Sequence, residues 1–155
     1  MNAESYLVRI ARHFAEIQLD AVMIGNAAAV LRGSPVTTLD VDFMLEHTDE
    51  NYRKLAALAQ RMDCKFIEMK LPGDNYMYRF MHRTEPLLLD FMFVAAGIAS
   101  YETLKNNSTD FPFGEHTLKI AALKDVIASK RAAGRPKDIN VIPILEMIQN
   151  EQRKQ

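Results

Sequence analysis

Residues 38–46, with the sequence TLDVDFMLE, decide how the fold of this chain is interpreted. Every second residue is large and apolar: Leu39, Val41, Phe43 and Leu45. This period of two predicts a strand with one buried face. Asp40 and Asp42 project from the opposite face of that strand. Because two neighbouring carboxylates are costly to bury, the predicted strand needs a compensating charge beside them.

The 155 residues correspond to one ordinary domain, which we expect to span residues 1–155, with C-terminal helices over about residues 122–150. Because 48% of the residues are apolar and 25% are charged, the chain should fold around a core. The net charge of −1 gives no global indication of nucleic-acid or membrane binding. Such a role would need a local patch of charge.

The single cysteine, Cys64, has apolar neighbours, which predicts a buried thiol and a reducing, cytoplasmic compartment. Residues 1–14 form an amphipathic segment that contains acid, so they do not resemble a signal peptide. The apolar run at residues 86–99 is interrupted by Asp90 and is too short to span a bilayer. We therefore expect no contact with a membrane.

Hydrophobic periodicity and turn signals predict an α+β fold, in which helices pack against a mixed β-sheet. The predicted helices cover residues 3–19, 26–33, 49–62, 122–134 and 135–149, with a short helix and loop within 97–112. The predicted strands cover residues 21–25, 39–46, 64–69, 76–82, 86–94 and 115–121. We expect Asn26 to cap the second helix and Pro143 to kink the last one.

A third carboxylate, Asp90, lies between Leu89 and Phe91 in another apolar strand. If this strand neighbours the first at about 4.8 Å, Asp90 joins Asp40 and Asp42 in one cluster. Three such carboxylates are stable together when protons or cations neutralise them, and oxygen ligands favour Mg²⁺ or Mn²⁺. Two such ions would suit phosphoryl or nucleotidyl transfer. The alternative is that these aspartates only face solvent at the edge of a sheet.

Gly25 and Asn26 stand where a buried strand turns directly into a helix. Glycine permits a tight turn and the close approach of a ligand, and a helix N-terminus suits a phosphate. The alternative is a purely structural turn and cap. The basic residues of 130–137 can likewise be read as a solvated helix end or as charge for a nucleotide. Residues 76–83 are interpreted as an amphipathic strand, although Arg79 and Arg83 could line a pocket.

In order along the chain, IGNAAAVLRG, TTLDVDFM and LLDFM resemble the signature of the nucleotidyltransferase superfamily with a DNA polymerase β-like core. Residues 118–148 also resemble the tail of small bacterial members, both the minimal and the abortive-infection-type toxin nucleotidyltransferases. In all, the resemblance touches residues 21–45, 86–94 and 117–148.

The resemblance implies that Asp40, Asp42 and Asp90 form a metal-binding catalytic triad, and that Asp90 helps to activate an attacking hydroxyl. It implies a nucleotide site that contains Gly25, Asn26, Thr38, Lys130, Arg135 and Lys137. Asp138 is expected to cap the last helix or to pair with a basic neighbour.

Two positions depart from the family pattern. Asn26 stands where the family has a second glycine or a serine, and Val36 stands where an arginine is common. Asparagine tolerates left-handed geometry and can donate from its amide, so phosphate binding is retained in an altered form.

The expected function is Mg²⁺- or Mn²⁺-dependent transfer of a nucleoside monophosphate from an NTP to a hydroxyl on RNA, protein or a small molecule. The family resemblance adds a role in a toxin–antitoxin pair, with a partner protein. One alternative is a non-catalytic nucleotide-binding domain that keeps the fold, and another is metal-dependent hydrolysis of a phosphate ester. The base and the acceptor stay open at this point.

Overall fold

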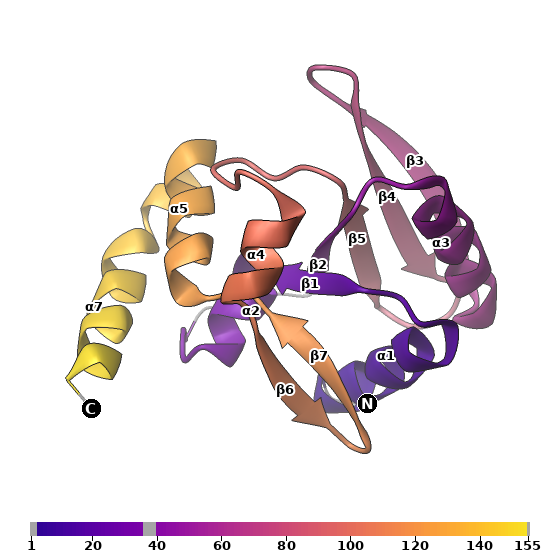
Figure 1. Ribbon diagram of the computed structural model, residues 1–155, viewed down its shortest axis with the longest axis horizontal. Coiled ribbons are helices and arrows are strands. Elements are labelled where there is room, and N and C mark those ends of the chain that lie inside the picture. The colour runs from indigo at the N-terminus through magenta and orange to yellow at the C-terminus, as the bar shows by residue number, and fades with distance from the viewer. Residues whose placement is uncertain (1–2, 36–39, 155) are drawn as a thin grey trace.

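The computed structural model describes residues 3–35 and 40–154 and centres on a seven-stranded mixed sheet (Figure 1). The strands are β1 Ala21–Ile24, β2 Asp40–Leu45, β3 Cys64–Leu71, β4 Asn75–His82, β5 Leu88–Met92, β6 Thr109–Phe113 and β7 His116–Ile120. The helices are α1 Ala3–Ile17, α2 Gly25–Leu31, α3 Asp49–Arg61, α4 Tyr101–Asn107, α5 Leu123–Ala133, α6 Pro136–Ile139 and α7 Ile142–Arg153. The predicted α+β class is confirmed.

The order of strands across the sheet is β3-β4-β5-β2-β1-β7-β6. The chain crosses over twice, so that β2 runs parallel to β5 and β1 runs parallel to β7, while the remaining neighbours are antiparallel. The central strand β2 therefore lies between β1 and β5. The two strands that carry the aspartates are direct neighbours, as the sequence analysis required for a carboxylate cluster.

The main core fills the space between α1, α3 and one face of the sheet. Phe43 of β2 lies between Phe14 of α1 and Phe91 of β5, with ring centroids 4.9 Å and 5.4 Å apart. Phe43 and Leu45 are fully buried and Val41 is half-buried, as predicted for this face, but Met44 on the other face is also buried, so burial along β2 does not alternate strictly. Leu39 lies outside the described residues. Because side chains alternate along a strand, Asp40 and Asp42 face the other side of the sheet.

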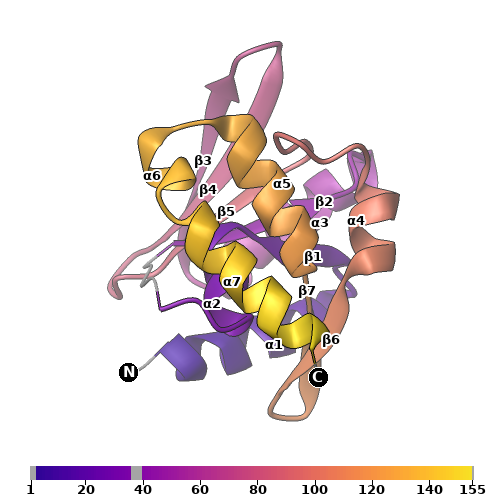
Figure 2. The same cartoon turned by 90° about the vertical axis from the view of Figure 1, so that its left-hand side faces the viewer.

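Helices α2, α5 and α7 form a second group. Helix α5 packs against both α2 and α7, and α2 packs against β1 and β2. Figure 2 shows α5, α6 and α7 together in front of the sheet. The packing of α5 against α2 therefore brings residues of the C-terminal helices beside the segment that begins at Gly25.

The ends of two predicted helices agree with their sequence signals. The Thr48 hydroxyl caps α3 by accepting from the Asn51 amide at 3.0 Å, and Asp49 and Glu50 occupy its first turn. Helix α5 ends at Gly134, whose φ of +68° is left-handed. Cys64 is buried, as predicted, and burial raises the pKa of its thiol to about 11.

Helix α2 begins one residue earlier than predicted. Gly25 is its first residue and Ile24 holds the capping position without a side-chain hydrogen bond, so the prediction that Asn26 caps this helix is wrong. Asn26 lies inside the first turn, where its side chain turns to another partner, described below.

Two further corrections concern the second half of the chain. The single helix predicted over 135–149 is two helices, α6 and α7, because Pro143 fits only the first turn of a helix, where no amide hydrogen is needed. Strand β6 falls partly in a region interpreted as a short helix and loop. This strand contains Pro112, which is tolerated because β6 lies at the edge of the sheet.

Within the described ranges, none of the helices combines the length and the apolar character needed to cross a membrane.

Phe43→Ala should lower the free energy of unfolding by about 3–5 kcal/mol, because a fully buried ring in contact with two other rings is replaced by a cavity. Urea denaturation measures this change. Met147→Ala is the control, since Met147 is 65% exposed on α7 and its loss should change stability by no more than about 0.5 kcal/mol. Equal effects at the two positions would contradict the assignment of the core.

Candidate active site

The strand register places five residues in one row across the sheet, beginning with Ile67 of β3 opposite Arg79 of β4. Asp42 of β2 lies opposite Asp90 of β5, and Arg79 of β4 lies opposite Asp90 on its other side. Ile24, the last residue of β1, lies opposite Asp42. Residues directly opposite one another project from the same face, so Arg79, Asp90 and Asp42 are side-chain neighbours. Asp40 shares this face, two residues before Asp42.

Asp42 experiences an electrostatic environment that disfavours its charge. Burial, followed by the nearby charges of Asp90 and Asp40, raises the pKa of its carboxyl to about 6. Arg79 and Lys130 act in the opposite direction without cancelling this effect. A proton or a cation would relieve the repulsion, so the negative charge on this face calls for a positive partner.

Asp90 already has such a partner. Arg79 donates to both of its carboxylate oxygens, from Nε to Oδ1 at 2.8 Å and from Nη2 to Oδ2 at 2.9 Å. The side chain of Asp90 is 5% exposed and that of Arg79 is 29% exposed. The hydrogen bond to Asp90 raises the pKa of Arg79 above its usual value. This two-pronged pair is among the stronger polar contacts that side chains make.

The pattern of residues 76–83 predicts an amphipathic strand in which Arg79 could line a pocket, but it does not predict the pairing of Arg79 with Asp90. The alternation of side chains along β4 does show which way Arg79 projects. Tyr78 and Phe80 are buried on the core face, so Arg79 had to project from the face that carries the aspartates. What the pattern could not supply was the position of β4 beside β5.

Asp40 and Asp42 offer the oxygen donors that Mg²⁺ and Mn²⁺ prefer, and burial together with the neighbouring carboxylates raises the pKa of Asp42, which a bound cation would oppose. These two residues therefore fit a divalent cation. Over residues 3–35 and 40–154, no three His, Cys, Asp or Glu side chains converge into a ready metal-binding group. In this arrangement Asp90 pairs with Arg79. The predicted metal triad stays a prediction.

Gly25 brings the backbone directly against this carboxylate group. Its φ is +68°, and a Cβ atom at this position would lie 2.8 Å from Oδ2 of Asp42. Any other side chain would force this contact apart, besides being strained in the left-handed region. A close approach of backbone to carboxylate is therefore built into the turn from β1 to α2.

Asn26, the next residue, is held by a lysine 104 residues further along the chain. The Lys130 ammonium donates to Oδ1 of Asn26 at 2.5 Å and lies 3.7 Å from Oδ1 of Asp138. Burial lowers the pKa of Lys130, and the Asp138 charge opposes that shift. Arg135 donates to the same aspartate at 2.6 Å. Asp138 thus pairs with basic neighbours, which was one of its two expected roles.

The six predicted nucleotide-binding residues are placed unequally. Gly25 and Asn26 lie beside the carboxylates, and the buried Lys130 joins them through Asn26. Arg135 is linked to this group by its hydrogen bond to Asp138, and Lys137 is exposed on α6. Thr38 lies outside the described residues, as does Val36.

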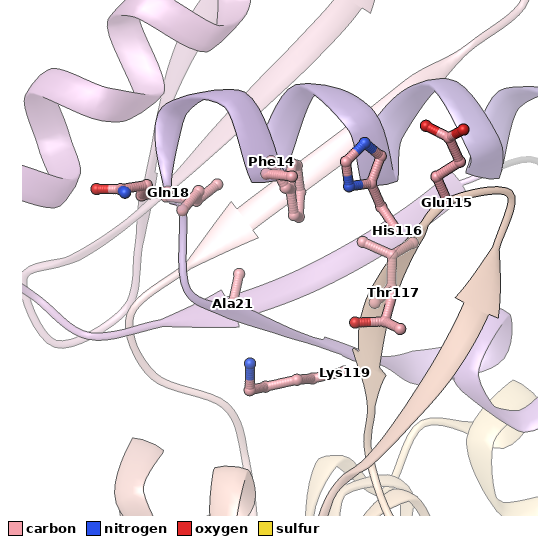
Figure 3. Close-up of a pocket in the computed structure, with 10 residues that line it drawn as sticks. Phe14, Gln18, Ala21, Glu115, His116, Thr117 and Lys119 are labelled. Atoms are coloured by element: carbon pink, nitrogen blue, oxygen red, sulfur yellow. The ribbon is translucent and has the colours of Figure 1, made fainter.

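A pocket of about 360 Å³ lies at the far end of β1 from Asp42, between the end of α1 and β7 (Figure 3). Phe14, Leu19 and Leu118 give it an apolar wall, while Glu115 and Lys119 add charge. Lys119 also pairs with Asp20 at 3.2 Å. None of the residues predicted from the sequence to bind a ligand lines this pocket.

Comparison with solved structures identifies the fold. The antibiotic-resistance factor ANT(2'')-Ia matches in its solution structure with a TM-score of 0.62 and 13% identity, over 97% of this chain and 91% of that chain. Its crystal structure in complex with adenylyl-2''-tobramycin gives a TM-score of 0.61 at 13% identity, over 97% of both chains.

Two further structures match with a TM-score of 0.56. One is a candidate nucleotidyltransferase from Thermotoga maritima, at 11% identity over 100% of this chain and 97% of that chain. The other is an antigenic nucleotidyltransferase-like protein from Paracoccidioides brasiliensis, at 15% identity over 92% and 74%. The sequence matches no protein-family model and no curated protein. The chain therefore has the nucleotidyltransferase-like fold that its motifs predicted.

Asp42→Asn should change how the stability of the protein depends on pH, measured in the presence of a chelator. The folded-state pKa of Asp42 is raised from 3.8 to about 6, so the wild type is most stable with this group protonated. Wild-type stability should fall by about 2–3 kcal/mol as the pH rises from about 4 through 6, and the variant should lose this dependence.

The matched control is Asp74→Asn, because Asp74 is 93% exposed at the tip of the β3–β4 hairpin. Urea denaturation at pH 4.5 and pH 8 gives the comparison. If Asp42→Asn is no more stable than the wild type at pH 8, the carboxylate at position 42 is not under the repulsion described above.

Proposed function

We propose that this chain is a metal-dependent nucleotidyltransferase that moves a nucleoside monophosphate from an NTP to a hydroxyl acceptor, which is RNA, protein or a small molecule. The observation that carries the proposal is the pairing of Asp42 with Asp90, with Gly25 against the Asp42 carboxylate. Carboxylates gathered beside an unshielded stretch of backbone suit a polyanionic ligand held through cations. A toxin acting with a partner protein is one setting for such an enzyme.

The fold shared with ANT(2'')-Ia supports nucleotidyl transfer as the general type of reaction. ANT(2'')-Ia, which has this fold, crystallises in complex with adenylyl-2''-tobramycin. In this chain β2, which carries two aspartates, lies beside β5, which carries the third, in the order of motifs that the family resemblance predicted.

The proposed reaction divides its roles among the aspartates. The acceptor oxygen bonds to the α-phosphorus of the NTP, and the bond from that phosphorus to the bridging oxygen breaks, so that pyrophosphate leaves. Asp40 and Asp42 would hold the cation, and Asp90 would accept the acceptor's proton at a carboxylate oxygen. Bound Mg²⁺ or Mn²⁺ would supply the positive charge that stabilises the phosphate oxygens.

The nucleotide side of the site would be completed by Gly25, Asn26 and Lys130. Because Oδ1 of Asn26 accepts from Lys130, its amide nitrogen is oriented away from that lysine and can donate to a phosphate oxygen. The buried ammonium also adds positive charge near Asp42. This arrangement accounts for asparagine at a position where the family pattern has glycine or serine.

A nucleotide-binding domain without turnover is the second candidate, and one observation favours it. Arg79 engages both oxygens of Asp90, and a carboxylate that stays so engaged is a poor proton acceptor. Nucleotide binding that is independent of Asp90, without transfer, would be the signature of this second function.

Transfer of label from an α-³²P-labelled NTP to RNA, protein and small-molecule hydroxyls tests the first candidate. We expect Mg²⁺-dependent labelling of one acceptor class and a loss of at least about a hundredfold in Asp42→Asn, which keeps the shape of the side chain. Asp74→Asn, at an exposed turn, should retain full activity.

Each of the other outcomes has a distinct meaning. Labelling that persists in Asp42→Asn or without a divalent cation would contradict the proposal. Release of free nucleotide with no labelled acceptor would indicate hydrolysis, and binding without either product would indicate the non-catalytic domain.

Lys130→Met should weaken NTP binding by about tenfold or more, because it removes the buried charge that holds Asn26. Isothermal titration measures the dissociation constant, and urea denaturation checks that the fold is kept. Lys124→Met is the control, since Lys124 is exposed on the same helix. Equal affinities for the two variants would place Lys130 outside the nucleotide site.

A further inference from the structure

Arg79 occupies a defined place in the row of charged residues. It lies beyond Asp90 as seen from Asp42, on the side of the row away from Gly25. In the proposed function, on which the role of Arg79 given below depends, the triphosphate lies near Gly25, so Arg79 is on the far side of Asp90 from the nucleotide.

The surroundings of Arg79 direct it toward Asp90. Its neighbours on this face are Met77 and Met81 along β4 and Ile67 opposite it on β3. These side chains offer the guanidinium no competing charge. Asp90 supplies two acceptor oxygens at 2.8 Å and 2.9 Å, in the planar fork geometry that arginine favours.

The pairing changes what Asp90 can do. Each of its oxygens accepts one charge-assisted hydrogen bond, and its side chain is 5% exposed, so the side of the carboxylate that faces Arg79 is closed to a cation. The positive charge of the guanidinium also repels a divalent ion at close range. Asp42, by contrast, lies with its Oδ2 atom against the backbone of Gly25, on the side of Asp90 away from Arg79.

We propose that Arg79 is a positioning residue that keeps Asp90 out of cation coordination in the nucleotide-free protein. The first divalent cation then binds through Asp40 and Asp42 alone. Asp90 is held in a fixed orientation by the two hydrogen bonds from Arg79, and it becomes available to the reaction when a ligand displaces the guanidinium. In this proposal Asp40 and Asp42 bind the cation, and Asp90 does not take part until the ligands are present.

A purely structural ion pair between β4 and β5 is the competing explanation. It would make Arg79 important for folding, and it makes no prediction about cation affinity. The two explanations differ most clearly in a variant without the guanidinium. Freeing a carboxylate beside Asp42 should strengthen cation binding, whereas mere damage to the fold can only weaken it.

Mn²⁺ titration of the nucleotide-free full chain, with free Mn²⁺ measured by electron paramagnetic resonance, is the test. Asp90→Asn should bind Mn²⁺ within about twofold of the wild type, and Asp42→Asn should lose about tenfold or more. Arg79→Met should bind about tenfold more tightly, and Arg79→Met combined with Asp90→Asn should return to the wild-type value. Arg79→Lys keeps the charge and should stay near the wild type.

Arg83→Met is the charge-matched control. Arg83 follows β4 and pairs with Asp63 at 3.3 Å, with both side chains more than half exposed. Its replacement should leave Mn²⁺ affinity unchanged. If Arg79→Met and Arg83→Met both bind Mn²⁺ more tightly than the wild type, the loss of one positive charge explains the gain in affinity. That result would overturn the proposal.

Asp90→Asn keeps the test decisive if Arg79→Met fails to fold, because the partly exposed Arg79 can then be solvated. A loss of about tenfold in Mn²⁺ affinity in Asp90→Asn would show that Asp90 is a cation ligand and would overturn the role of Arg79, while leaving the proposed function intact. Unchanged affinity in a folded Arg79→Met would overturn it as well. A wild-type protein that binds no Mn²⁺ would overturn both proposals.

Discussion

The parallel pairing of β2 with β5 is the interaction on which the rest of this structure depends. On one face it stacks Phe43 on Phe91 and so forms the centre of the core under α1. On the other face the same register sets Asp42 beside Asp90. One set of backbone hydrogen bonds therefore fixes both the main source of stability and the carboxylate pair. A slip of a single residue would exchange the two faces and destroy both.

The carboxylates introduced by this pairing are balanced from two sides. Arg79 reaches Asp90 from β4, the next strand outward, and Lys130 approaches from α5 on the opposite side of the row. The balance is incomplete, since the pKa of Asp42 remains raised. Asp90 has an arginine partner in the fold, whereas Asp42 keeps a raised pKa. The two aspartates therefore differ in their electrostatic environment, which suits them to different roles.

The C-terminal helices complete the site rather than merely cover it. Lys130 ties α5 to the first turn of α2, and Asp138 of α6 joins Lys130 to Arg135. A substitution of Asn26 would therefore remove a hydrogen-bond acceptor of Lys130, which lies in the C-terminal part of the chain. The altered turn at Gly25 and Asn26 is consistent with this, because the asparagine oxygen that replaces the family's usual glycine or serine is the group that Lys130 binds.

The sequence by itself determined which face of each strand is buried, because alternation of apolar residues is a local property that any strand must obey. Asp40, Asp42 and Asp90 could be placed on one face for this reason, and the order of the motifs was enough to predict the fold. Only the tertiary structure decided that Arg79 holds Asp90 and that Lys130 holds Asn26, while Arg135 and Lys137 lie further out. These pairings depend on strand order and helix docking across long sequence separations, and hydrophobic periodicity encodes neither.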